Sequence, residues 1–92
     1  MAVDDAHDIR SPAEQDAVIE AAVLTQLLVL HPVHVTFEEL LRSMVVEPKD
    51  FARRDAIERA VRDLVAAGLL HRHEDFVFPS HAALRFDELL GG

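Results

Sequence analysis

Apolar residues recur at helical spacing in several stretches of the chain, and the first stretch has clear start and stop signals. Ser11 and Glu14 form a capping-box pattern around Pro12, a residue favoured in the first helical turn. His31-Pro32 should end the helix, because the residue before proline avoids helical backbone angles. These signals predict a helix over residues 12–30.

A second capping-box pattern joins Thr36 to Glu39 and marks the start of a short helix. Leu40, Leu41 and Met44 would give this helix an apolar inner face, and Met44 stands near its end. A connector that contains a proline then separates it from the next helix.

The third helical stretch has an ambiguous start and a clear end. Asp50 and Asp55 are both suitable N-caps, so the helix should begin between Phe51 and Asp55. Gly68 stands where a residue in the left-handed conformation commonly closes a helix. On a helical wheel four residues face inward: Ile57, Ala60, Val61 and Leu64. Four others face outward: Asp55, Arg59, Arg62 and Ala66.

After Gly68 the pattern alternates between apolar and polar residues, which is typical of strands. Three strands are expected, over residues 33–35, 69–73 and 76–78. A two-residue turn at Glu74-Asp75 would join the last two into a hairpin. The predicted cross-strand pairs on one face are His73 with Phe76 and His71 with Phe78.

Pro79 should end the second hairpin strand, and Ser80 is a suitable cap for a last helix. This helix has apolar side chains available for packing: Leu84, Phe86, Leu89 and Leu90. Residues 11–92 therefore form one predicted domain, α+β and mostly helical. Residues 1–10 are polar and acidic without periodicity, which predicts a mobile acidic tail.

The first helix is apolar on nearly all sides. One stripe comprises Ala17, Ala21, Leu24 and Leu28, and further apolar residues occupy other faces. A helix with this pattern is buried on more than one side. One side should pack on the core, and another should meet either the last helix or a second subunit. In the second case the protein would be a homodimer. The candidates for dimer or docking contacts are Ile19, Val23 and Leu30.

Composition narrows the functional classes. The chain has 92 residues and no cysteine, which excludes disulfides and thiolate metal sites. No secretory segment and no apolar run long enough to span a bilayer is present, so we expect a cytoplasmic protein without membrane contact. The sequence also lacks a glycine-rich phosphate loop and a nucleophile signature, so neither an enzyme nor a bound cofactor is expected.

Charge is distributed unevenly along the chain. The formal net charge is −8, which repels a polyanion such as DNA at long range. Six acidic residues stand among the first twenty, whereas five of the nine basic residues lie between Lys49 and Arg62. The basic side chains are therefore concentrated on the third helix and the connector before it.

The order helix, short strand, helix, helix, hairpin, helix resembles the winged helix-turn-helix superfamily of bacterial transcription regulators. The most specific part is AVRDLVAAGLL, which begins at Ala60 and matches the family pattern of a recognition helix that leads into the wing. The resemblance covers residues 12–90. It implies a three-helix core, a short strand with a two-stranded wing, and a C-terminal helix.

The resemblance also implies that the third helix enters the major groove of double-stranded DNA while the wing contacts the flanking backbone or minor groove. The candidate DNA contacts are Arg53, Arg54, Asp55, Arg59, Arg62 and Arg72. Asp55 and Glu58 on the third helix depart from what a DNA-binding surface needs, because carboxylates repel phosphates. The wing tip departs in the same way, because its turn is Glu74-Asp75. Alternatively, the helix arginines form local ion pairs with nearby acids on a solvated surface.

Six histidines are present, and His71 and His73 share one face of a predicted strand. His34 would lie near them if the short strand pairs beside the hairpin. Three imidazoles could bind zinc, nickel or copper, but no strict metal motif is present. The alternative is that His71 and His73 pack their rings against Phe76 and Phe78, so no metal is expected.

Two functions follow from these patterns. The first is a small DNA-binding transcription regulator that acts as a homodimer. The second is an acidic winged-helix module that binds a protein partner without contacting DNA. Charge favours the second hypothesis, whereas the fold resemblance favours the first.

Overall fold

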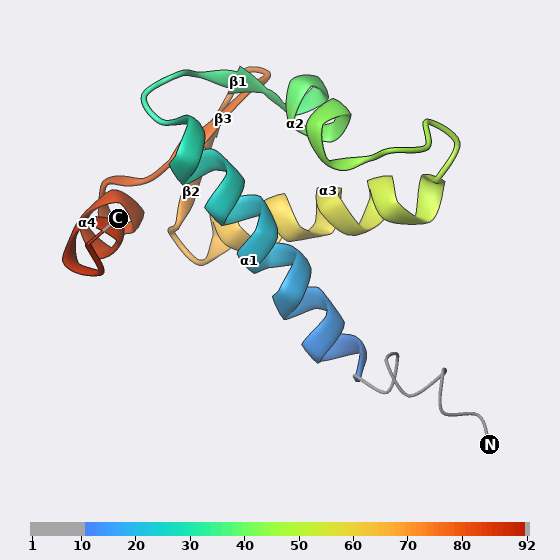
Figure 1. Cartoon of the computed structure of the whole chain (residues 1–92), viewed down its shortest axis with the longest axis horizontal. Coiled ribbons are helices and arrows are strands. Elements are labelled where there is room, and N and C mark those ends of the chain that lie inside the picture. The colour runs from blue at the N-terminus through green and yellow to red at the C-terminus, as the bar shows by residue number, and fades with distance from the viewer. Residues whose placement is uncertain (1–10, 92) are drawn as a thin grey trace.

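A computed structural model describes residues 11–91 of the chain, and the predicted acidic tail over residues 1–10 lies outside this part. The described elements follow the order α1 (Pro12–Leu30), β1 (Val35–Thr36), α2 (Phe37–Met44), α3 (Phe51–Ala66), β2 (Leu70–His73), β3 (Phe76–Pro79) and α4 (His81–Leu89). Over this range the fold is α+β and mostly helical, as predicted, with four helices and a three-stranded antiparallel sheet (Figure 1).

Both predicted capping boxes are present. The Ser11 hydroxyl accepts a hydrogen bond from the Glu14 N–H at 3.2 Å, and the Glu14 carboxylate accepts one from the Ser11 N–H at 2.9 Å. Thr36 and Glu39 make the same reciprocal pair at 3.1 and 2.8 Å. Each box satisfies two N–H groups that the first helical turn leaves without a partner, which fixes where α1 and α2 begin.

The start of α3 is settled by Asp50, whose carboxylate accepts from the Arg53 N–H at 3.0 Å. Asp55 therefore lies in the second turn and is not the cap. At the other end Gly68 has a φ of +82° and follows the C-cap, Ala67. The Leu69 N–H then donates to the Leu64 carbonyl at 2.9 Å, so that the chain leaves the helix directly into β2.

The sheet has the strand order β1-β3-β2, and both pairs are antiparallel. The predicted hairpin register is confirmed: His73 pairs with Phe76, and His71 with Phe78. Glu74 in the turn has a φ of 56°, a conformation that few residues other than glycine adopt. The second hairpin strand ends at Pro79, one residue beyond the predicted range 76–78, because Pro79 still pairs with Leu70.

The short strand also differs from its predicted bounds. It comprises Val35 and Thr36 rather than residues 33–35, and Val35 pairs with Val77. The Phe37 N–H continues this ladder by donating to the Asp75 carbonyl at 2.8 Å. The hairpin turn is therefore attached to the start of α2.

The core lies where α1 crosses α3 and the sheet closes over them (Figure 1). Its largest fully buried side chains are Leu27, Leu40, Ile57, Leu70, Val23, Val61 and Val77. The four residues that were expected to face inward on α3 are all buried. No buried side-chain nitrogen or oxygen in residues 11–91 lacks a hydrogen-bond partner.

The predicted contact residues of α1 require correction. Val23 is fully buried in the core and cannot meet a second subunit. Ile19 and Leu30 are partly buried against the same core cluster. Of the apolar stripe that includes Ala17, Ala21 and Leu24, the two alanines are exposed, whereas Leu24 packs against the core. The core-facing side of α1 lies a third of a turn away, around Val23.

The last helix packs less than expected. Within the described chain α4 contacts mainly β3, and Ala83 is its buried residue. Phe86, Leu89 and Leu90, which were available for packing, are 61%, 67% and 70% exposed and do not pack inside the described domain. Leu84 is half-buried. An apolar surface therefore remains open on α4.

Candidate nucleic-acid interface

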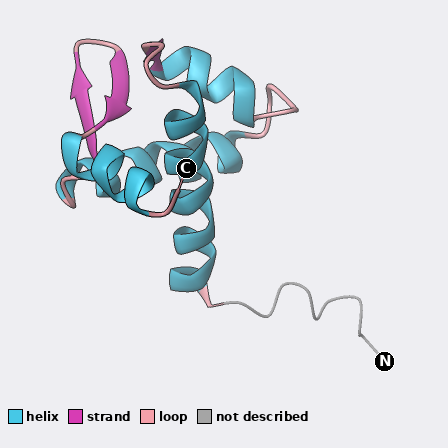
Figure 2. Ribbon diagram, turned by 60° about the vertical axis from the view of Figure 1, so that its left-hand side comes forward, coloured by secondary structure: helices cyan, strands magenta, loops and turns pink. Residues whose placement is uncertain are grey.

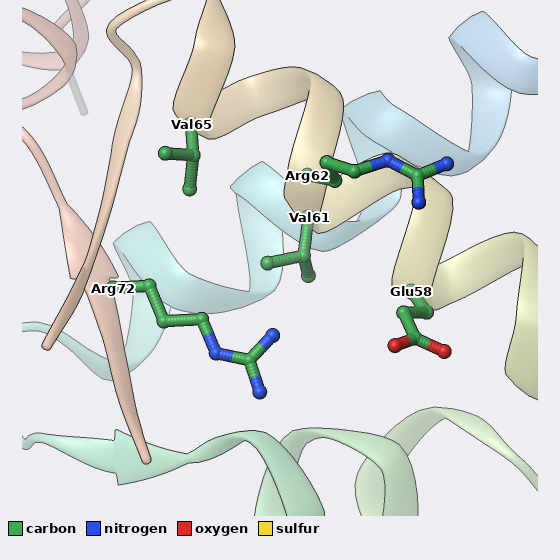
Figure 3. A pocket seen from close by; sticks show the side chains of 5 residues that line it. All are labelled: Glu58, Val61, Arg62, Val65 and Arg72. Atoms are coloured by element: carbon green, nitrogen blue, oxygen red, sulfur yellow. The ribbon is translucent and has the colours of Figure 1, made fainter. Parts of the chain in front are cut away.

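A hollow of about 210 Å³ lies between α3 and the hairpin (Figure 3). Glu58, Val61, Arg62 and Val65 reach it from α3, because residues spaced by three and four share one side of a helix. Arg72 reaches it from β2. Two arginines from separate elements therefore line the same surface, with one carboxylate at its edge.

Arg72 is held in position by an aromatic ring. Its guanidinium carbon lies 4.7 Å from the centre of the Phe37 ring. This contact depends on the sheet, because Arg72 pairs with Val77 and the Phe37 N–H is bonded to the hairpin turn. A cation over an aromatic face at a partly exposed site gains roughly 0.5–1 kcal/mol. The contact orients the guanidinium and leaves its N–H donors available for a ligand.

Arg62 has no carboxylate within ion-pairing distance among residues 11–91. It is exposed on the outer side of α3, and Figure 3 shows its side chain extending away from the helix beside the hollow. Its charge is therefore not neutralised by a contact within the described chain. Such a guanidinium can still form paired hydrogen bonds to an external anion.

Two other candidate arginines point toward neighbouring helices. Arg59 forms an ion pair with Asp16 of α1 at 3.6 Å, and Arg54 lies 3.9 Å from Glu38 of α2. The side chains of both pairs are at least one-third exposed, so each pair contributes less than about 1 kcal/mol to the free energy of unfolding. The structure thus separates these two arginines from the hollow between α3 and the hairpin.

The remaining candidates on α3 lie near its start. Arg53 is half-buried in the first turn, where its backbone N–H bonds to the Asp50 cap. Asp55 is exposed in the second turn. Of the six predicted DNA contacts, the structure therefore brings together only Arg62 and Arg72.

Sequence reasoning missed two residues of this surface, Phe37 and Val65. The spacing of Val65 from Arg62 could have placed it on the same side of α3. Phe37 gave no such signal, because its contact with Arg72 depends on how β1 pairs with the hairpin.

The hairpin turn carries the acidic residues Glu74 and Asp75, both of which are exposed. The Asp75 carbonyl is bonded to Phe37, so this turn lies beside the start of α2. The acidic charge of the turn is therefore close to Arg72 rather than at the far end of a long projecting loop. The negative charge of the turn therefore opposes the binding of an anion by Arg72.

Of the three histidines considered as metal ligands, His34 and His71 lie on opposite sides of β3, because His34 precedes β1 and His71 belongs to β2. The His34 ring stacks on Phe78 with 5.3 Å between centroids, and His71 packs on the same phenyl ring at 5.7 Å. The predicted packing of His71 against phenylalanine is confirmed, and His34 does lie beside the hairpin. Within residues 11–91 no three histidine, aspartate or glutamate side chains are grouped closely enough to hold a metal ion.

Comparison of the chain with models of protein families, with curated proteins and with solved structures found no match. Within residues 11–91, no helix combines the length and the apolar character needed to cross a lipid bilayer.

Proposed function

We propose that the protein is a small winged helix-turn-helix protein of the cytoplasm that binds double-stranded DNA and regulates transcription. The described order α1-β1-α2-α3-β2-β3-α4 agrees with this architecture. In that arrangement α3 is the recognition helix and the β2-β3 hairpin is the wing.

One observation carries the proposal: Arg62 and Arg72 line the same hollow from the helix and from the wing. With α3 in a major groove, Arg62 would contact a base edge or a phosphate, and Arg72 would contact the adjacent backbone. The Phe37 ring supports this role because it already orients Arg72. Arg59 would contribute only after its exposed pair with Asp16 opens.

The net charge of −8 sets the expected strength of binding. Few phosphates would be neutralised, and the acidic wing tip would repel the backbone nearby. The complex should therefore form at low ionic strength and weaken as salt rises. Sequence-specific binding would depend on α3, with little help from the wing.

The test is fluorescence anisotropy with a labelled random-sequence duplex at about 50 and about 200 mM salt. The combined Arg62→Ala and Arg72→Ala variant should bind at least about tenfold more weakly, and its salt dependence should be flatter. Arg42→Ala is the matched single-charge control, because Arg42 is exposed on α2 and does not line the hollow. Equal binding by the double variant and the native chain would refute the proposed interface.

The alternative function, a module that binds a protein partner without contacting DNA, is favoured by the exposed apolar residues of α4. Isolated apolar side chains on a surface are ordinary, but Phe86 and Leu89 of α4 and the C-cap Leu90 are three and four residues apart and so share one side of the helix end. The same titration separates the two functions. A native chain that shows no salt-dependent binding to any duplex at the lower ionic strength would favour the protein-binding module.

A further inference from the structure

The side of α3 that borders the hollow carries three different chemical groups in one row. Glu58, Arg62 and Val65 are spaced by four and three residues, so they share one side of the helix and line the same hollow (Figure 3). All three side chains are exposed, including the apolar Val65 at 38%. The row therefore presents a hydrogen-bond acceptor, several donors and an apolar group to a ligand.

The two charged members of this row have no ionic partner within residues 11–91. Glu58 and Arg62 are four residues apart on the helix, yet they form no ion pair with each other or with another described side chain. Arg59, one turn before the end of the row, is instead paired with Asp16 of α1. The carboxylate of Glu58 and the guanidinium of Arg62 are therefore both available to a ligand.

The mixed chemistry of the row matches base edges better than a phosphate backbone. A carboxylate repels phosphate, and an apolar side chain gains nothing from contact with it. The floor of the major groove offers three matching groups: the two acceptors of guanine for arginine, the amino group of cytosine for glutamate, and the methyl group of thymine for an apolar side chain. A surface that only bound phosphates would not need Glu58 or Val65.

The length of the row agrees with the spacing of base pairs. Val65 lies seven positions after Glu58, which corresponds to about 10 Å along a helix. Successive base pairs are about 3.4 Å apart, so this distance covers about three base-pair steps. Arg62 lies between the other two residues, and each of the three can therefore reach a different base pair.

Arg72 has a different position and a different role. It belongs to β2, and its guanidinium is held 4.7 Å from the centre of the Phe37 ring. The β2-β3 hairpin stands at the edge of the helical part of the molecule (Figure 2). With α3 in the groove, Arg72 therefore contacts the flanking backbone, which fixes the orientation of the protein and carries no sequence information.

We infer that Glu58, Arg62 and Val65 select the sequence of the bound duplex by contacting cytosine, guanine and thymine, respectively, within about four base pairs. This inference rests on the proposed DNA binding and specifies which duplexes are preferred. Glu58 then has a function that its charge alone does not explain: it lowers the affinity for every duplex and lowers it least where a cytosine satisfies the carboxylate.

The first measurement is the selection of duplexes from a random-sequence library by the native full chain at about 50 mM salt. The enriched duplexes should share a guanine, a cytosine and a thymine within about four base pairs. The selected duplex is then made with 7-deazaguanine, which lacks the N7 acceptor, or with uracil, which lacks the methyl group of thymine. In fluorescence anisotropy the native chain should bind the first at least about fivefold and the second about threefold more weakly.

Variants then assign each base to its residue. In Arg62→Ala the 7-deazaguanine duplex should cause no further loss of binding, and in Val65→Ala the uracil duplex should cause none. Glu58→Gln should lose the preference for cytosine, because an amide offers donors as well as an acceptor. Arg72→Ala is the control: it should bind every duplex more weakly and remain sensitive to 7-deazaguanine. Circular dichroism verifies that each variant is folded.

Three results would overturn the inference and leave the proposed function intact. The native chain could bind duplexes without enriching any sequence, or 7-deazaguanine could leave its binding unchanged. Alternatively, 7-deazaguanine could weaken binding by Arg62→Ala as much as binding by the native chain. Absence of binding to every duplex at the lower salt concentration would instead refute the proposed function and this inference together.

Discussion

At the scale of single residues, the arginines differ mainly in what surrounds them. Arg54 and Arg59 have carboxylate partners on neighbouring helices, whereas Arg72 lies over an aromatic ring and Arg62 has no ion pair in the described chain. An incoming phosphate must compete with Asp16 for Arg59, but it meets Arg62 without competition. Local context, rather than the number of arginines, therefore decides which of them can bind an anion.

The capping glutamates give a prediction for acid pH. Hydrogen bonds from the backbone and side chain of Thr36 lower the pKa of Glu39, and those from Ser11 lower the pKa of Glu14. Because folding lowers the pKa of each carboxyl, its hydrogen bonds stabilise the fold fully when the pH is above the unfolded pKa of about 4.3. This stabilisation is lost as the pH falls through the folded pKa. The melting temperature should therefore decline below about pH 4.3, in part through these two groups.

Glu39→Gln isolates that contribution. Glutamine can keep the capping hydrogen bonds but has no charge to lose, so its melting temperature should fall less steeply with acid than that of the native chain. Glu58→Gln is the control, because it removes an exposed carboxylate that makes no hydrogen bond within residues 11–91. Thermal melts by circular dichroism from pH 7 to pH 3 measure the slopes, and parallel slopes for Glu39→Gln and the native chain would contradict the prediction.

At the scale of elements, the sequence predicted what depends on neighbours along the chain. The capping boxes, the Gly68 helix end and the hairpin register all rest on residues a few positions apart. The core side of α1 was not predictable in this way, because α1 is apolar nearly all round and its own pattern does not distinguish inside from outside. The same limit applies to the contacts of Arg59 with Asp16 and of Arg72 with Phe37, which join separate elements.

The start of α3 provides an element-scale prediction. Asp50→Ala removes the cap that accepts from the Arg53 N–H and should lower the free energy of unfolding by about 1 kcal/mol. Asp55→Ala is the matched substitution inside the helix and should be neutral or slightly stabilising, because alanine is the better helix former. Urea unfolding of both variants measures the difference. Equal loss in both variants, or a larger loss for Asp55→Ala, would contradict the assignment of Asp50 as the cap.

At the scale of the whole molecule, an acidic chain carries a small surface with two arginines. Within residues 11–91 three ion pairs are present, and the side chains in all of them are at least one-third exposed. Such pairs offset little of the repulsion among the 17 acidic residues of the chain. Salt should therefore have opposite effects on two properties: it should weaken DNA binding, and it should stabilise the fold by screening that repulsion.

The last prediction concerns this stabilisation. Raising sodium chloride from about 20 to about 200 mM at neutral pH shortens the screening length and should raise the melting temperature by a few degrees. The combined Asp55→Asn and Asp63→Asn variant removes two of the 17 acidic residues and changes the formal net charge from −8 to −6. Its melting temperature should rise less with salt, because less repulsion remains to be screened. A fall in the melting temperature of the native chain with salt would mean that the exposed ion pairs outweigh the repulsion.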